Sequence, residues 1–168
     1  MQFNDYAQWT DNVAVYPKVH EPHYLALGIA EEIGEMVRTR TNEELVAEAG
    51  DVIWYCARYS RLVLNRDFDE LCRMDVVPIS NPFEVLQPLS VIAGVEKKRL
   101  RDGETWDDEK RQAKHQAATI ALAQIIDYTF NCTRSFADTE PEAVLAANVA
   151  KLSARKQAST IQGDGDHR

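Results

Sequence analysis

The stretch from Tyr24 to Cys56 reads YLALGIAEEIGEMVRTRTNEELVAEAGDVIWYC, and its spacing of apolar residues predicts a pair of amphipathic helices. Gly28 and Gly34 would let a partner helix come close to the first one. The tetrad Thr41-Asn-Glu-Glu44 has the form of a capping box, so a second helix is expected from there to about Leu64. Residues expected to face inward are Leu25, Ile29, Ile33, Met36, Val37, Leu45, Val46, Ala49, Val52, Ile53 and Cys56.

Helical periodicity continues along the chain, and strand signals are almost absent. A loop with Pro78 and Pro82 precedes a third helix, which Asp102-Gly103 is expected to end. Thr105-Trp-Asp-Asp108 resembles another capping box, and Thr139-Glu-Pro-Glu142 marks the start of a last helix. The expected helices cover residues 24–38, 41–64, 86–101, 105–134 and 139–156. We therefore expect one all-α domain over residues 1–168, a helical bundle of about five helices with a tail at 157–168.

The two halves of the chain, residues 1–75 and 80–156, resemble each other weakly, because each has a shorter helix followed by a longer one. Leu27-Gly-Ile-Ala can be laid over Leu89-Ser-Val-Ile, and the segment 52–56 over 125–129. Two interpretations stay open: degenerate copies of one helical hairpin, or two similar hairpins without common origin. On this alignment the four acidic residues discussed below fall on Gly94, Lys97, Ala121 and Gln124.

Composition and charge exclude several classes of protein. The chain has 168 residues, 45% hydrophobic and 27% charged, and no apolar run long enough for a membrane span. Its net charge of −8 argues against binding a nucleic-acid polymer, which relies on basic patches. Three cysteines at spacings unlike a zinc site, and a beginning without a signal sequence, lead us to expect buried, reduced thiols and a cytoplasmic setting.

The negative charge is concentrated between Glu31 and Asp51, where seven acidic and two basic residues carry a net −5. Glu32 and Glu35 are three residues apart on the first helix, as are Glu48 and Asp51 on the second, so each pair shares a helix face. If the helices pair antiparallel, all four carboxylates converge, and a hard divalent cation such as Mg²⁺ or Mn²⁺ is the natural partner. The alternative is a solvated acidic face, although these residues border the apolar stripe.

These residues also carry a resemblance to a known family. Leu27-Gly-Ile-Ala-Glu-Glu-Ile-Gly-Glu35, followed after twelve residues by Glu48-Ala-Gly-Asp-Val-Ile-Trp-Tyr55, resembles the Glu-x-x-Glu and Glu-x-x-Asp signature of MazG-like nucleotide pyrophosphohydrolases. Asn148-Val-Ala-Lys-Leu-Ser-Ala-Arg155 and Gly163-Asp-Gly-Asp-His-Arg168 are similar to closing motifs of the phage and bacterial branch. The middle of the chain, roughly 65–135, fits the family less well.

The resemblance implies an all-α, oligomeric enzyme that uses Mg²⁺ to cleave a nucleoside triphosphate between the α and β phosphates, giving a monophosphate and pyrophosphate. Carried over by position, Glu32, Glu35, Glu48 and Asp51 would be the metal ligands, and Glu35 is also our choice for the residue that orients or deprotonates the attacking water. A homodimer or a higher homo-oligomer is expected, in nucleotide-pool control or clearance of unwanted nucleotides.

Phosphate groups also need cations from the protein. Lys151 and Arg155 lie four residues apart with Asn148 one turn earlier, and these three are candidate substrate-binding residues; a solvated helix face is the alternative. The family often has Lys-Lys and Arg-Asp-Gly between its acidic motifs, whereas here a similar string begins at Lys97, which could contact phosphate or be an exposed helix end. Tyr55 is a candidate for stacking on a nucleobase, while Trp54 fits the core better.

The sequence bears on three other interpretations. A di-iron carboxylate bundle is disfavoured, because its Glu-x-x-His pairs are missing from this sequence. His20 and His23 form a His-x-x-His pair with no further ligand nearby, which disfavours zinc. The alternative function is a non-catalytic helical adaptor or regulatory protein that kept the fold. The four acidic residues argue against it, whereas the lack of matching acidic residues in the second half leaves it open.

Overall fold

The computed structural model describes residues 1–160, and this part of the chain is helical and contains no strand. The expected all-α class is confirmed. Within residues 1–160 there are seven α-helices and three short 3-10 helices, two α-helices more than the five expected. The α-helices are α1 (Phe3–Trp9), α2 (Glu21–Met36), α3 (Asn42–Leu62), α4 (Phe68–Cys72), α5 (Leu86–Asp102), α6 (Asp108–Ala137) and α7 (Pro141–Gln157). The 3-10 helices are η1 (Thr10–Asn12), η2 (Lys18–His20) and η3 (Gly103–Thr105).

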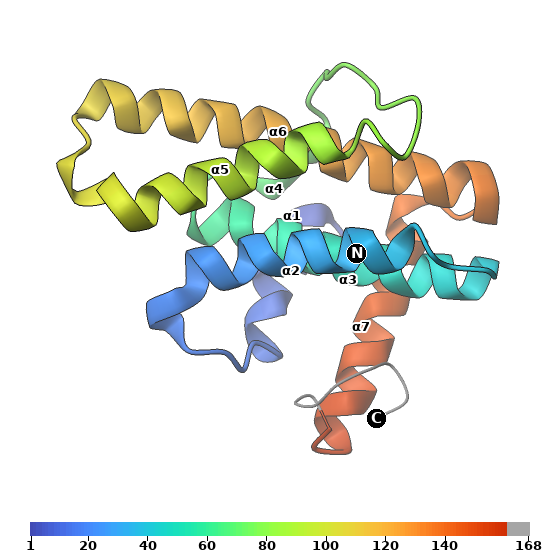
Figure 1. Ribbon diagram of the computed structural model, residues 1–168. Coiled ribbons are helices and arrows are strands. Elements are labelled where there is room, and N and C mark those ends of the chain that lie inside the picture. The colour runs from blue at the N-terminus through green and yellow to red at the C-terminus, as the bar shows by residue number, and fades with distance from the viewer. Residues whose placement is uncertain (161–168) are drawn as a thin grey trace.

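Two helical hairpins form the body of the molecule (Figure 1). Helix α2 packs along α3, α5 packs along α6, and the hairpins meet through contacts of α3 with α6 and of α2 with α5. Helix α7 crosses α3 and points away from the bundle, below it in Figure 1. Each proposed half-repeat thus contributes one hairpin, and a common origin of the two stays a prediction.

The start of α3 is confirmed as a capping box. The hydroxyl of Thr41 accepts a hydrogen bond from the backbone N–H of Glu44 at 3.1 Å, and the Glu44 carboxylate accepts one from the backbone N–H of Thr41 at 3.3 Å. This reciprocal pair satisfies backbone donors that the first helical turn leaves open. It ends the short turn after α2 and thereby fixes where α3 begins relative to α2.

The second expected capping box is wrong. Asp107, not Thr105, caps α6, because its carboxylate accepts a hydrogen bond from the backbone N–H of Lys110 at 2.7 Å. Thr105 belongs to η3, and its hydroxyl donates to the carbonyl of Asp102. Aspartate caps a helix as well as threonine does, and the sequence pattern does not distinguish the two positions.

The two helices missing from the sequence analysis, α1 and α4, are too short for apolar periodicity to show. They pack against each other and close one side of the bundle, where the ring of Phe3 lies edge-on to Phe68 and beside Phe130 of α6. Tyr6 is fully buried between α1 and the rest of the core. Packing against the rest of the protein therefore stabilises these helices, because helices this short are not stable in isolation.

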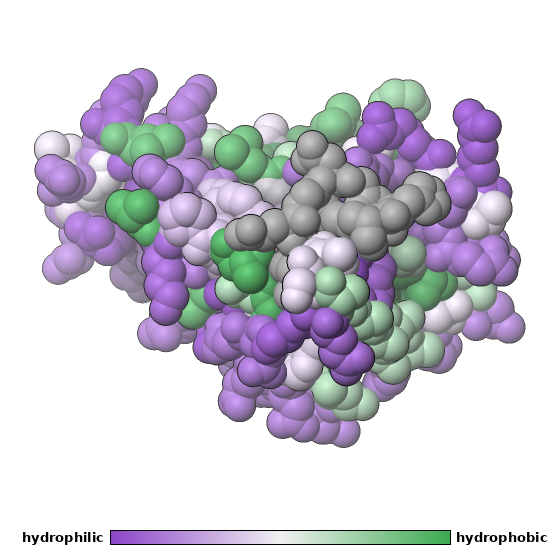
Figure 2. Space-filling model, turned by 90° about the horizontal axis from the view of Figure 1, so that it is seen from below, coloured by the Kyte–Doolittle hydropathy of each residue, from purple (hydrophilic) through white to green (hydrophobic). Residues whose placement is uncertain are grey.

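The surface agrees with the composition. The face seen from below is mainly hydrophilic, with apolar residues in separate spots (Figure 2). Among the described helices, none is long and apolar enough to cross a membrane. The three cysteines are free, with Cys56 buried and Cys72 and Cys132 half-buried, so the expectation of burial holds fully for Cys56 only.

Helix α2 contains two glycines whose surroundings differ sharply. A Cβ atom added at Gly28 would lie 2.2 Å from Cε1 of Tyr55, whereas nothing lies within 4 Å of a Cβ added at Gly34. We expect Gly28→Ala to lower the free energy of unfolding by about 1–3 kcal/mol, because the Tyr55 ring must move. Gly34→Ala is expected to raise it by about 0.5–1 kcal/mol, because alanine favours the helix.

Urea unfolding followed by circular dichroism measures both changes. Equal stability of the two variants would contradict the close packing of α2 against Tyr55 described above.

Candidate functional site

Three carboxylates converge between α2 and α3. Glu32, Glu48 and Asp51 each offer an oxygen atom, and these oxygens lie within 4.8 Å of one another. Glu48 is 9% exposed, and the side chain of Asp51 is 14% exposed. Among the residues that the structure describes, no other group of three potential ligands is this close. The expected convergence of the two acidic pairs is therefore seen for three of the four residues.

The fourth acidic residue, Glu35, lies outside this cluster. Its side chain is 45% exposed and one oxygen is 4.0 Å from the guanidinium of Arg38. Glu35 lies one residue before the end of α2, beside the turn that leads into α3, whereas Glu32 lies one turn earlier and faces α3. A direct role of Glu35 as ligand or base stays a prediction, although its charge still acts on Glu32.

The carboxyl groups of the cluster repel one another when they are ionised. Burial, followed by the charges of Asp51, Glu48, Glu35 and Glu31, raises the pKa of Glu32 to about 8. Each of these causes disfavours a further negative charge in a half-buried place. A site that holds a carboxyl group protonated near neutral pH is one in which a bound cation would replace the proton.

Helix α7 supplies the polar partners of Asp51. Asn148 donates a hydrogen bond from Nδ2 to Oδ1 of Asp51 at 2.8 Å, and the Nζ of Lys151 donates to Oδ2 of Asp51 and to the carbonyl of Ala47. Tyr6 donates from its hydroxyl to Oδ1 of Asn148 at 2.8 Å, which orients the amide. Two of the three candidate substrate-binding residues on α7 thus contact the carboxylate cluster.

The close approach of α7 to α3 depends on Gly50. A Cβ atom at this position would lie 2.9 Å from Cβ of Asn148, so a larger residue would push α7 outward. Asn148 is 2% exposed and has no room to adjust. The glycine next to Asp51 is therefore part of the site, because it allows the α7 side chains to reach Asp51.

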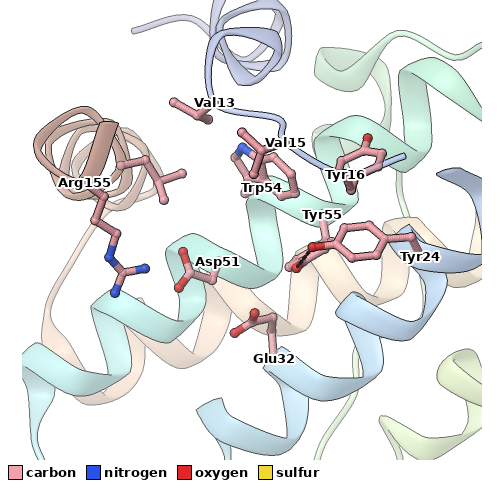
Figure 3. Close-up of a pocket in the computed structure, with 10 residues that line it drawn as sticks. Val13, Val15, Tyr16, Tyr24, Glu32, Asp51, Trp54, Tyr55 and Arg155 are labelled. Carbon is pink, nitrogen blue, oxygen red and sulfur yellow. Dashed lines mark hydrogen bonds between the residues drawn. The ribbon is translucent and has the colours of Figure 1, made fainter. Parts of the chain in front are cut away.

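A pocket of about 110 Å³ adjoins the cluster, and Glu32, Asp51 and Arg155 lie on its wall (Figure 3). Arg155 is 7% exposed, and Figure 3 shows its guanidinium directed toward Asp51. The remaining wall is apolar or aromatic: Val13, Val15, Tyr16, Tyr24, Trp54, Tyr55 and Leu152. The pocket thus combines anionic, cationic and aromatic groups.

The aromatic wall is a connected set of rings. The rings of Tyr16 and Tyr24 stack with centroids 4.4 Å apart, and the hydroxyl groups of Tyr24 and Tyr55 are 3.3 Å apart. Trp54 lies edge-on to Tyr55, at 4.9 Å, and is 8% exposed. Tyr55 therefore lines the pocket as its proposed role requires, and Trp54 is a core residue that also forms part of the wall.

A buried arginine that the sequence analysis missed fixes this wall. Arg58, 3% exposed, forms ion pairs with Asp11 at 2.9 Å and Glu21 at 3.4 Å, and donates to the hydroxyl of Tyr16. Its guanidinium also lies 5.2 Å from the centre of the Tyr16 ring. The only sequence signal was a basic residue on the inward face of α3, and its acidic partners lie some 40 residues earlier in the chain.

The structure does not bring the other candidates to this site. Lys97 is exposed on α5 and is not part of the pocket wall. Gly163-Asp-Gly-Asp-His-Arg168, the closing motif quoted above, lies outside the described residues. The role of Lys97 in substrate binding stays a prediction.

Comparison of the chain with models of protein families, with curated proteins and with solved structures gave no significant match. The resemblance to MazG-like enzymes consequently rests on the motif residues themselves.

The raised pKa of Glu32 makes stability depend on pH. Between about pH 4.5 and pH 8, Glu32 keeps its proton in the folded chain but has released it in the unfolded chain. Without divalent cations, the free energy of unfolding therefore falls as pH rises through this window. Glu32→Gln removes the effect, and at pH 8 we expect this variant to be more stable than the wild type by about 1–3 kcal/mol, with the gain vanishing near pH 4.5.

Urea unfolding at several pH values in the presence of a chelator measures this dependence. Glu31→Gln is the control on the same helix: it removes the smallest of the charges that raise the pKa of Glu32, so its profile should keep the pH dependence of the wild type with only a small shift. A Glu32→Gln profile parallel to the wild-type one would contradict the assignment.

Proposed function

We propose that this protein is a Mg²⁺-dependent nucleoside triphosphate pyrophosphohydrolase of the MazG-like kind. The observation that carries the proposal is the convergence of three carboxylates within 4.8 Å, beside a pocket that combines Arg155 with an aromatic wall. A triphosphate nucleotide needs these three features together: a place for divalent cations, a cation for phosphate, and flat apolar rings for the base.

The donor set fits Mg²⁺. Carboxylate oxygens are the ligands that this hard cation prefers, and burial together with the nearby carboxylates raises the pKa of Glu32 to about 8. Glu32, Glu48 and Asp51 would hold the ion, with Glu35 as a further proposed ligand. When bound, Mg²⁺ would neutralise phosphate oxygens and lower the pKa of a coordinated water. Mn²⁺ shares these preferences.

The protein's own groups have distinct tasks in this proposal. Lys151 and Asn148 hold both oxygens of Asp51, so this carboxylate keeps one orientation while the substrate binds. Arg155 directs its planar guanidinium at the same place and suits a phosphate oxygen. Tyr55 offers its ring to the base. Glu35, exposed and one turn from Glu32, would accept the proton of the attacking water, and pyrophosphate and a nucleoside monophosphate would be released.

The first test is cation binding. At pH 7 the carboxyl of Glu32 is largely protonated, so binding of one Mg²⁺ should release close to one proton, and fewer at pH 9. Calorimetric titration with MgCl₂ in two buffers of different ionisation enthalpy measures the number of protons released. Glu32→Gln should bind Mg²⁺ more weakly and release no proton. Heats that do not depend on the buffer would contradict the ionisation state described for Glu32.

The second test is hydrolysis. The purified protein is incubated with Mg²⁺ and a panel of canonical and modified nucleoside triphosphates, and pyrophosphate is measured. We expect Glu48→Gln and Asp51→Asn to reduce kcat/KM at least about 100-fold, because each removes a charge that acts on the transition state. Glu31→Gln, on the exposed side of α2, is the control and should keep the wild-type rate.

Two results would overturn the proposal: no substrate of the panel is cleaved, or the Glu48 and Asp51 variants are as fast as the wild type. Mg²⁺ binding without any cleavage would favour the adaptor or regulatory alternative. Light scattering on the same samples tests the proposed homodimer or higher oligomer.

A further inference from the structure

A second cavity lies at the far end of the α5–α6 hairpin. It has a volume of about 330 Å³ and is lined by Arg99 of α5, by Gly103, Glu104 and Trp106 of the connection, and by Arg111 and His115 of α6. Figure 1 shows this end of the hairpin far from α7, which supplies the partners of Asp51. The carboxylate cluster and this cavity are therefore separate places on the molecule.

Both arginines of the cavity are held in place by the protein. The Nη2 of Arg111 donates a hydrogen bond to the backbone carbonyl of Trp106 at 3.0 Å. Arg99 forms an ion pair with the buried Glu96 at 3.4 Å, and Glu96 in turn accepts a hydrogen bond from Tyr59. Two guanidinium groups on opposite helices are thus positioned before any ligand binds, which reduces the entropy lost on binding.

Several hydrogen-bond donors around the cavity have no acceptor. These are Nε1 of Trp106, a residue that is 5% exposed, and Nε and Nη2 of Arg99, whose ion pair with Glu96 lacks hydrogen-bond geometry. A buried donor without an acceptor costs free energy comparable to a lost hydrogen bond, and most such groups in proteins have a partner. The missing partner is an acceptor, and an anion with several oxygens could serve more than one donor.

The charges around the cavity are mainly positive. His115 has a pKa below its ordinary value because of burial first and then the charges of Arg99 and Arg111. Arg66, in the loop between α3 and α4, also lowers this pKa, and Glu96 raises it. Glu104 is the acidic residue on the wall itself. Guanidinium groups bind phosphate oxygens through paired hydrogen bonds, so this arrangement selects a phosphate over a neutral ligand.

A larger hollow of about 630 Å³ adjoins the cavity and shares Arg111 and His115 with it. Its other walls combine apolar, amide and charged side chains: Leu64, Arg66, Asp108, Glu109, Gln112, Ala113 and Gln116. A ligand whose phosphate is bound between Arg99 and Arg111 would therefore have space for an organic group beside it.

We propose that the cavity between Arg99, Trp106 and Arg111 binds the phosphate group of a small phosphate ester, at a site separate from the carboxylate cluster. The proposal does not rest on the hydrolase activity, because it needs neither Mg²⁺ nor a triphosphate.

Calorimetric titrations of the full chain in the presence of a chelator test it. The probes are inorganic phosphate and a nucleoside monophosphate, with KCl at equal ionic strength as the blank. We expect Arg111→Gln to raise the Kd for both probes about tenfold or more, because a charge-assisted hydrogen bond is lost. Glu104→Gln should lower the Kd about two- to threefold, because it removes a repelling charge. The nucleoside monophosphate should bind more tightly than free phosphate.

Two further variants make the test specific. Trp106→Phe keeps an aromatic ring in the core but removes the indole donor together with part of the ring volume, and it should also weaken binding; its fold is checked by circular dichroism. Arg101→Gln removes an exposed arginine of the same helix, which pairs with Asp102, and should leave the Kd unchanged. Phosphate heats equal to those of KCl, or an unchanged Kd for Arg111→Gln and Trp106→Phe, would overturn the proposal.

Discussion

The mutual repulsion of three carboxylates held within 4.8 Å is the constraint on which the rest of this structure depends. Glu32 comes from α2 and Glu48 and Asp51 come from α3, so the packing that buries the apolar faces of these helices also brings like charges together. Such an arrangement persists only with compensation. Lys151 and Asn148 compensate Asp51 from α7, and a proton on Glu32 relieves the remaining repulsion near neutral pH.

The compensation explains features that are remote from the cluster in sequence. Helix α7 must lie close to α3 for Lys151 to reach Asp51, and Gly50 makes this approach possible. Tyr6 of the N-terminal helix orients Asn148, so both ends of the described chain meet at the same carboxylate. Arg58 holds the aromatic wall in a similar way, through acidic partners on α2 and on the segment after α1. The site is therefore assembled from four separate parts of the chain.

Much of the fold was predictable because it follows from local patterns. Helices α2, α3, α5, α6 and α7 begin and end within about three residues of the expected bounds, since apolar periodicity and capping residues act over single turns. Helices α1 and α4 were not predictable, because seven and five residues are too few for a periodic signal and their stability comes from burial. The cap of α6 was assigned to Thr105 instead of Asp107, because both residue types suit a helix start.

The sequence by itself determined the all-α class, the α2–α3 hairpin and the pairing of acidic residues on two helix faces, because helical spacing fixes which side chains share a face. Only the tertiary structure decided that Glu32, Glu48 and Asp51 meet while Glu35 stays exposed outside the cluster. The tertiary structure also decided that the side chain of Lys151 reaches Asp51. The reason is that the rotation and distance between packed helices depend on contacts between distant parts of the chain, and no local pattern records them.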